Sequence, residues 1–270
     1  AMAGKANMAD EVIEMVASDV TAALQKQFNS GPRGAFKLRM SNIGKPKCQL
    51  WFEKNDPEDR TPMPPHFLMN MMLGDIVEAV FKGLLRASGV EFSDNDNVTL
   101  ELPNGHNIKG EYDMELNGRI DDVKSASPWS YNNKFESYET LAKGDSFGYV
   151  AQLVGYATAA NKEVGGWWVV NKANGEFKYV DATPNKEEVI KDIVDLVDYI
   201  ENDEPFERCF GPEPETYYKK PSGNMVLNKS CQWCSFKHKC WPDLKVLPSK
   251  VSKSKNPPDV EYVSLATETP

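Results

Sequence analysis

The sequence predicts an α/β fold in which a central mixed sheet is flanked by helices. Apolar residues recur at helical spacing in several long segments of the chain. Strand-like stretches lie between these segments, and two of them turn at an Asn-Gly pair, at 117–118 and 174–175, which is a strong hairpin signal. The resulting order of helix, three strands, helix, strands and helix is typical of one α/β domain.

Four helices are expected. The first spans residues 9–28, the second 66–86 and the third 147–161. Thr183 is expected to cap a fourth helix that carries Pro184 at its first position. The first helix shows the clearest apolar stripe, with members four residues apart: Val12, Val16, Val20, Leu24 and Phe28.

The strand-like segments fall between the second and fourth helices. Three of them are expected near 98–103, 106–116 and 119–125, and the last two form a hairpin through Asn117-Gly118. A second hairpin is expected over 166–181. After residue 202 the chain is rich in turns and passes through a cysteine cluster.

Bulk composition bounds the class of protein. The chain has 270 residues, of which 40% are hydrophobic and 26% charged, with a net charge of −9. These values are ordinary for a soluble protein with a sizeable core. The acidic balance argues against a surface that coats nucleic acid indiscriminately, although it leaves room for a local basic groove. No run reaches the roughly 18 apolar residues of a membrane span and no signal peptide is recognisable, so we expect a cytoplasmic protein (in the host cytoplasm if it is viral) with no membrane partner.

The expected domain organisation is simple. Residues 1–8 begin Ala-Met-Ala-Gly and are expected to be a disordered cloning remnant. Residues 9–243 are expected to form one domain with its core at about 64–202. The polar residues 244–270 are expected to be a mobile tail.

Acidic residues gather around the Asn117-Gly118 turn. In a two-residue turn residue 116 pairs with 119, so Asp113 lies opposite Asp122 and Lys124 shares their face. Opposed residues have Cβ atoms about 5 Å apart, and two unit charges at that distance repel by about 3 kcal/mol at an effective dielectric near 20. A divalent cation such as Mg²⁺ or Mn²⁺ would cancel this repulsion.

Alternatives remain open for this hairpin. Its acids can simply be solvated on an exposed surface, and a three-residue turn would place Asp113 and Asp122 on different faces. In the two-residue register Glu111 falls opposite Lys124 as a cross-strand ion pair. Asp121 points to the other face, where we expect it to be solvated.

The sequence GEYD at 110–113, followed by DVK at 122–124, resembles the core of the PD-(D/E)xK nucleases, which have a restriction-endonuclease-like fold. In that superfamily the two acids hold metal on adjacent strands. Two further pairs are similar to RecB-like members: Gly74 with Glu78 on the helix before the hairpin, and Gln152 with Tyr156 on the helix after it. The glutamate at position 78 resembles phage recombination exonucleases, whereas CRISPR-associated members usually have histidine there.

The resemblance implies a role for each of these residues. Lys124 would orient the attacking water or help to deprotonate it. Gln152 and Tyr156 would hold the scissile phosphate or position Lys124. The implied ligands of Mg²⁺ or Mn²⁺ are Glu78, Asp113, Asp122 and the backbone carbonyl of Val123.

Five cysteines are present, and three of them form a C-x2-C-x5-C pattern at Cys231, Cys234 and Cys240. In a cytoplasmic protein this spacing indicates a metal site rather than disulfides. Zinc is the commoner occupant of four-cysteine sites, and His238 could compete as a ligand. Cys48 lies far upstream, and Cys209 is left over.

One early cysteine and a late C-x2-C-x5-C around a nuclease core resemble the iron–sulfur nucleases, among them the CRISPR-associated RecB-like exonucleases and the AddB nuclease domain. The resemblance implies a [4Fe–4S] cluster held by Cys48, Cys231, Cys234 and Cys240. The cluster would join the N-terminal and C-terminal segments, at about 40–52 and 228–243.

The expected function is therefore a metal-dependent DNA exonuclease that serves recombination, repair or phage replication. A structure-specific endonuclease and a non-catalytic DNA-binding iron–sulfur module are the alternatives. The expected partners are DNA that is single-stranded or has single-stranded ends, and a recombination or replication protein. Candidate DNA contacts are the basic and aromatic side chains of Arg33, Lys37, Arg39, Lys45, Lys47, Trp129 and Tyr131.

Overall fold

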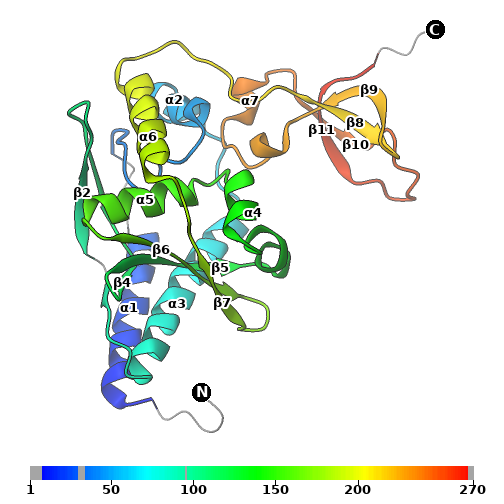
Figure 1. The fold of residues 1–270 in the computed structure, drawn as a ribbon. Coiled ribbons are helices and arrows are strands. Elements are labelled where there is room, and N and C mark those ends of the chain that lie inside the picture. Colours follow the sequence, from blue (N-terminus) through cyan, green and yellow to red (C-terminus); the bar gives the residue numbers. More distant parts are fainter. Residues whose placement is uncertain (1–7, 30–33, 95, 267–270) are drawn as a thin grey trace. The chain divides into compact units, whose positions relative to one another are not determined.

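The computed structural model describes residues 8–29, 34–94 and 96–266 (Figure 1). The chain forms two compact units. Unit 1 comprises Ala1–Lys45 and Pro64–Glu201, and unit 2 comprises Pro46–Met63 and Asn202–Pro270. The prediction of a single domain over 9–243 is therefore wrong. The chain passes from one unit to the other three times, and two of these boundaries lie at a proline, Pro46 and Pro64. The sequence marks the loops around them only as breaks between helices.

The helices of unit 1 follow the predicted apolar stripes closely. They are α1 (Asp10–Phe28), α3 (Pro65–Ala87), α4 (Tyr138–Lys143), α5 (Tyr149–Ala159) and α6 (Lys186–Glu201), with a π-helical turn η2 (Ser130–Lys134). The predicted cap of α6 is wrong. Asn185 caps this helix instead of Thr183, because its side-chain oxygen accepts a hydrogen bond from the Glu188 N–H at 3.3 Å.

Unit 1 has a mixed five-stranded sheet in the order β1-β4-β5-β6-β7 and a two-stranded sheet of β2 and β3. Strands β5 and β6 are parallel, and the other pairs are antiparallel. The predicted strand over 106–116 is broken at Tyr112-Asp113, and its two halves belong to different sheets. The strands are β1 (Ser93–Asp94), β2 (Asn97–Glu101), β3 (Asn107–Glu111), β4 (Met114–Leu116), β5 (Arg119–Ala126), β6 (Glu163–Asn171) and β7 (Phe177–Asp181).

Helices cover both faces of the five-stranded sheet (Figure 1). On one face α3 packs through Phe81, whose ring centroid lies 5.4 Å from that of Trp168. On the other face α5 and α6 enclose the core around the fully buried Trp167, with Leu153 and Val197. Unit 1 is therefore a mixed sheet flanked by helices, as predicted.

Asp121 and Asp122 are successive residues of β5, so their side chains lie on opposite faces of the sheet and have different environments. Asp121 faces α3 and is only 3% exposed. Its carboxylate accepts hydrogen bonds from the Gly166 N–H, the Trp168 indole N–H and the Tyr179 hydroxyl, at 2.9–3.1 Å. The expectation that Asp121 is solvated is wrong, because α3 and strands β6 and β7 cover that face.

Unit 2 is built from both ends of its sequence. It contains α2 (Lys47–Asn55), and Phe52 of this helix stacks on Phe236 with centroids 5.5 Å apart. The Thr61 N–H donates to the Ser235 carbonyl at 2.8 Å. The short helical segments that follow are η1 (Pro57–Asp59), η3 (Lys229–Cys231) and α7 (Lys237–Cys240).

The C-terminal part of unit 2 forms a four-stranded antiparallel sheet in the order β10-β11-β9-β8. The predicted mobile tail over 244–270 is thus wrong for 245–264. There the fully buried Tyr262 donates a hydrogen bond to Glu215 at 2.7 Å. The strands are β8 (Glu213–Tyr217), β9 (Lys220–Val226), β10 (Lys245–Pro248) and β11 (Asp259–Ser264). Across the described residues of both units, helices long and apolar enough to cross a membrane are absent.

Candidate functional site

The acidic hairpin has the predicted two-residue turn. Leu116 pairs with Arg119, and Asn117 and Gly118 have positive φ values of 53° and 76°. The turn fixes which side chains share a face, because side chains alternate along each strand. Asp113 precedes the first residue of β4, and its Oδ2 accepts a hydrogen bond from the Val123 N–H at 3.0 Å. Asp113 is therefore tied to β5 at the level of Asp122.

Asp122 and Lys124 form a partly buried ion pair on the face of β5 opposite Asp121. Asp122 is 4% exposed, and the Lys124 Nζ lies 2.6 Å from its Oδ1. Burial raises the pKa of Asp122 well above its ordinary value; Lys124 opposes this shift and Asp113 adds to it. Burial also disfavours the Lys124 ammonium, but Asp122 and Asp113 outweigh burial and raise the pKa of Lys124, so it stays charged. The predicted pair Glu111–Lys124 does not form, because Glu111 on β3 is paired with Asn97.

Glu78 of α3 interacts electrostatically with Asp113 and Lys124. Its pKa is raised to about 7, first by burial and then by Asp113, while Lys82 and Lys124 oppose the shift. Lys82 is 2% exposed and donates a hydrogen bond to Glu78 Oε1 at 2.6 Å. Lys82 was not among the residues expected from the sequence, although its position four residues after Glu78 puts both on one helical face.

Gly74 lies one turn before Glu78 and faces β5. A methyl group at Gly74 would make an ordinary 3.6 Å contact with Ser125 Oγ. The glycine is therefore not needed for helix and sheet to approach each other.

Stability in the absence of metal is expected to depend on the ionisation of Glu78. Its folded-state pKa of about 7 exceeds the ordinary 4.5, so the native state binds more protons between these values and stability falls as pH rises through that window. The difference amounts to about 3 kcal/mol at most. In EDTA, the free energy of unfolding of the wild type should therefore fall more steeply from pH 4.5 to 7 than that of Glu78→Gln. Parallel curves from urea titrations of the two proteins would contradict this assignment.

The pair Gln152 and Tyr156 lies on α5, against the same cluster. Burial raises the pKa of the Tyr156 hydroxyl to about 12; a hydrogen bond with Gln152 opposes the shift, and Asp113 and Asp122 add to it. The Tyr156 ring packs over Gly110, where an added Cβ would lie 2.7 Å from its Cε1. The glycine of the GEYD sequence therefore makes room for Tyr156. Tyr149, which was also not among the residues expected from the sequence, places its ring centroid 5.2 Å from the Lys124 Nζ.

The chemistry of this donor set suits a hard divalent cation. The carboxylates of Glu78 and Asp122 are disfavoured by burial and by the charge of Asp113, and the Lys124 ammonium offsets part of that charge. The arrangement is looser than a closed ion site. Among the described residues, only the loop acids Asp56, Glu58 and Asp59 of unit 2 bring three such ligand atoms within 4.8 Å of one another.

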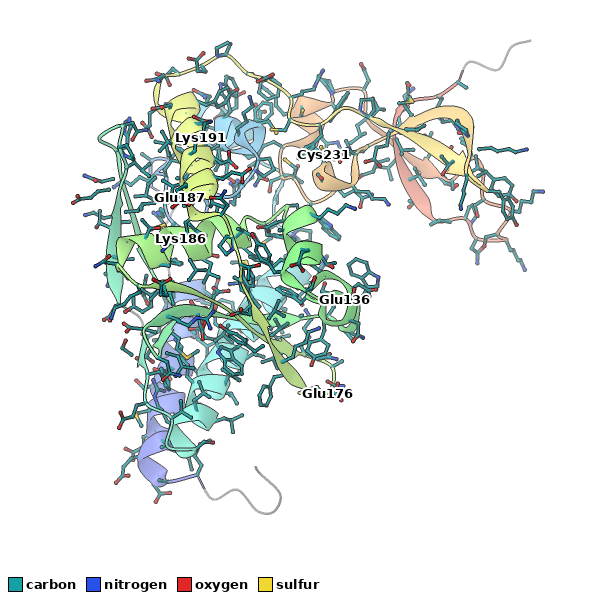
Figure 2. All side chains as sticks on the ribbon, in the orientation of Figure 1. Glu136, Glu176, Lys186, Glu187, Lys191 and Cys231 are labelled. Carbon is teal, nitrogen blue, oxygen red and sulfur yellow. The ribbon has the colours of Figure 1, made fainter. Side chains whose placement is uncertain are left out.

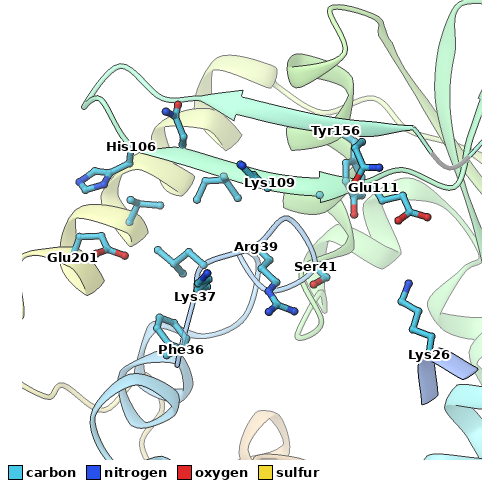
Figure 3. Close-up of a pocket in the computed structure, with 16 residues that line it drawn as sticks. Lys26, Phe36, Lys37, Arg39, Ser41, His106, Lys109, Glu111, Tyr156 and Glu201 are labelled. Carbon is cyan, nitrogen blue, oxygen red and sulfur yellow. The ribbon is translucent and has the colours of Figure 1, made fainter. Parts of the chain in front are cut away.

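Unit 1 has a cavity of about 740 Å³, and Tyr156 lines it (Figure 3). The segment that carries Lys37 and Arg39 runs along β3, where the Met40 N–H donates to the Lys109 carbonyl at 3.0 Å. Within the described part of the chain, the cavity-lining Lys37, Arg39 and Lys109 side chains make no ion pair. Glu111 and Glu201 also line the cavity, so its lining has mixed charge, with lysine and arginine in excess.

The other predicted DNA contacts are scattered. Arg33 lies outside the described residues. Lys45 ends the first segment of unit 1, whereas Lys47 belongs to unit 2 and forms an ion pair with Glu207. Trp129 is 69% exposed, and Tyr131 lies under the Lys178 ammonium at 4.5 Å. Of the predicted contacts that fall within the described residues, only Lys37 and Arg39 line the cavity.

All five cysteines belong to unit 2, and all are partly buried. Cys231 lies at the end of η3 (Figure 2). Burial raises its pKa to about 12, and Cys48, Cys234 and Cys240 are close enough to add to that shift. Burial likewise raises the pKa of Cys234 to about 11, with further contributions from Cys48 and Cys240. The four predicted ligands thus lie in the same part of unit 2, near enough to influence one another's ionisation.

Cys209 lies beside Cys48. Its Sγ accepts a hydrogen bond from the Cys48 backbone N–H at 3.1 Å. Three cysteine sulfurs within 4.8 Å of one another do not occur among the described residues, whereas a single tetrahedral zinc would hold four that close. A four-iron cluster binds each thiolate through a different iron atom, so its ligands stand farther apart.

Comparisons with known proteins add little to this geometry. No family model and no curated protein matches the chain. Among solved structures, one titled "Crystal structure of SSO0001" is similar with a TM-score of 0.44 and 12% sequence identity, covering 84% of this chain and 94% of that one. A similarity of this size carries no argument about the fold or the activity.

Proposed function

We propose that this protein is a divalent-metal-dependent DNA nuclease, and specifically an exonuclease, on a restriction-endonuclease-like core. The observation that carries the proposal is the electrostatic interaction of Glu78, Asp113, Asp122 and Lys124 in one partly buried cluster, although Glu78 comes from a helix and the others from the acidic hairpin. Perturbed pKa values such as those of Glu78, Asp122 and Lys124, close to a cavity that lysine and arginine side chains line, are typical of an active site.

Each side chain has a role in this mechanism. Glu78, Asp113, Asp122 and the Val123 carbonyl would hold Mg²⁺ or Mn²⁺, which supplies Lewis acidity and an activated water when bound. Lys124 is an ammonium in this arrangement, so it would donate to the attacking water or to the phosphate and offset the charge that develops there. Gln152 and Tyr156 would position the phosphate between the cluster and the cavity.

The basic cavity indicates the substrate. Lys37, Arg39 and Lys109 would accept the phosphates of a DNA strand that leads to the cluster. In unit 2, a [4Fe–4S] cluster held by Cys48, Cys231, Cys234 and Cys240 would fix α2 to the segment around α7. That role is structural, and the nuclease chemistry requires only unit 1.

Cleavage assays on end-labelled linear DNA and on covalently closed circular DNA distinguish an exonuclease from an endonuclease. With Mg²⁺ or Mn²⁺ the protein should release nucleotides from linear DNA and leave the circle intact, and EDTA should stop the reaction. Circular DNA cut as fast as linear DNA would indicate an endonuclease. Cleavage that persists in EDTA, or that is unchanged in Lys124→Ala, would overturn the proposal.

A further inference from the structure

The hairpin between β8 and β9 in unit 2 does not use the turn residues that its geometry favours. Tyr217 pairs with Lys220, and the two residues between them, Tyr218 and Lys219, both have positive φ, at 47° and 65°. Such a turn favours Asn and Gly, which the chain does place at its other two-residue hairpin. A tyrosine and a lysine with this backbone are strained. Their side chains are therefore retained at a cost to folding.

These side chains form an exposed aromatic and basic tip. Tyr218 is 83% exposed, and its ring meets that of Tyr217 edge-on with centroids 4.5 Å apart. The Lys253 Nζ lies 5.7 Å from the Tyr217 centroid. Lys219 and Lys220 are exposed. Within the described residues, Lys219, Lys220 and Lys253 make no ion pair, so the tip carries three uncompensated positive charges.

A buried network holds the base of this tip. Glu215 of β8 accepts hydrogen bonds from Asn224 of β9 at 2.7 Å and from Ser222 at 3.1 Å. Tyr262 and Ser249 also donate to it, at 2.7 and 3.3 Å. The network fixes both strands below the turn, so little freedom is lost when the tip binds a partner.

We propose that this tip binds a single-stranded nucleic acid, with a base stacked on Tyr218 and phosphates beside Lys219, Lys220 and Lys253. The lysines favour a polyanion, and the open ring favours a planar group. An acidic peptide is a polyanion but offers no base to stack on Tyr218. A duplex is also a polyanion, but its bases are already stacked on one another. This binding surface lies in unit 2 and does not depend on the proposed nuclease chemistry.

The test measures binding of the full chain to a fluorescein-labelled oligothymidine by anisotropy in EDTA, where metal-dependent cleavage cannot occur. Replacing Tyr218→Asn together with Lys219→Gly should raise the melting temperature, because the turn relaxes. It should also weaken binding about fivefold or more. Tyr218→Phe should keep the affinity, and Lys245→Ala, an exposed lysine of the same sheet, serves as the control. Lys220→Ala should lower the slope of log affinity against log salt by about 0.7.

Photo-crosslinking locates the contact. An oligonucleotide that contains 5-iododeoxyuridine should crosslink to the peptide that carries Tyr218. Wild-type affinity in the double variant, or crosslinks that map only to unit 1, would overturn the proposal. Displacement by polyglutamate as effective as that by oligothymidine would also overturn it, since the tip would then be a site for acidic proteins. Loss of nuclease activity with this binding intact would count against the proposed function alone.

Discussion

The Asp122→Asn variant is expected to lose about a hundredfold to a thousandfold of its metal-dependent cleavage, whereas Asp121→Asn keeps its activity and loses stability instead. Asp122 faces Lys124 and Asp113 in the candidate active site. An amide at 122 removes a charged oxygen ligand and the partner of the Lys124 ammonium. The measurement is the initial rate of release from end-labelled linear DNA at saturating Mg²⁺.

Asp121 is a closely matched control, because it is the preceding residue and equally buried. Its two oxygens accept from three donors, and Oδ2 alone serves the Trp168 indole N–H at 3.1 Å. An amide nitrogen in that position would leave two donors facing each other, at a cost of about 1–3 kcal/mol. Urea unfolding should show this loss. If both variants retained activity, or if both lost it with no change in stability, the assignment of the two faces of β5 would be wrong.

The register of the acidic hairpin was predictable because it depends on local rules alone. Asn117-Gly118 fixes the turn, and alternation along the strand then separates Asp122 from Asp121. The environment of Asp121 was not predictable in this way. Its burial depends on α3, β6 and β7, which lie far from it in the sequence. Periodicity shows which residues share a face but not what covers that face.

Two further strand pairings also depend on partners that the local sequence does not reveal. Glu111 was expected opposite Lys124, yet the strand breaks at Tyr112 and β3 pairs with β2 instead. A pair between Glu111 and Lys124 requires one continuous strand over 106–116. In unit 2 the strands near Lys245 and Asp259 are short and polar, and their stability comes from partners such as β9 rather than from local propensity. Composition alone therefore indicated a tail.

The grouping of four cysteines was expected only through a family resemblance, because Cys48 and Cys231 are 183 positions apart in the sequence and no local rule fixes their distance. No role was predicted for the fifth cysteine, Cys209. The structure puts Cys209 against Cys48, which makes the choice of the fourth ligand a question for experiment.

Cys234→Ser is expected to lose the bound iron and to destabilise unit 2 strongly, whereas Cys209→Ser retains both iron and stability. Cluster binding contributes folding free energy when the ligands come from separate segments, as they do here. A loss of about 5 kcal/mol, which is below the range for structural metal sites, would lower the melting temperature by about 20 °C or more at about 4–8 °C per kcal/mol. Anaerobically purified variants should be compared by iron and sulfide analysis, visible absorbance and limited proteolysis of unit 2.

Cys48→Ser distinguishes the two candidates for the fourth ligand. If Cys48 is the ligand, this variant loses iron as Cys234→Ser does, and Cys209→Ser does not. The opposite result would assign the ligand role to Cys209 and leave Cys48 as the residue whose N–H donates to it, since that hydrogen bond comes from the backbone and survives the substitution. Zinc in place of iron in the anaerobic wild type would refute the iron–sulfur proposal while leaving the carboxylate cluster of unit 1 untouched, because the two sites share no residue.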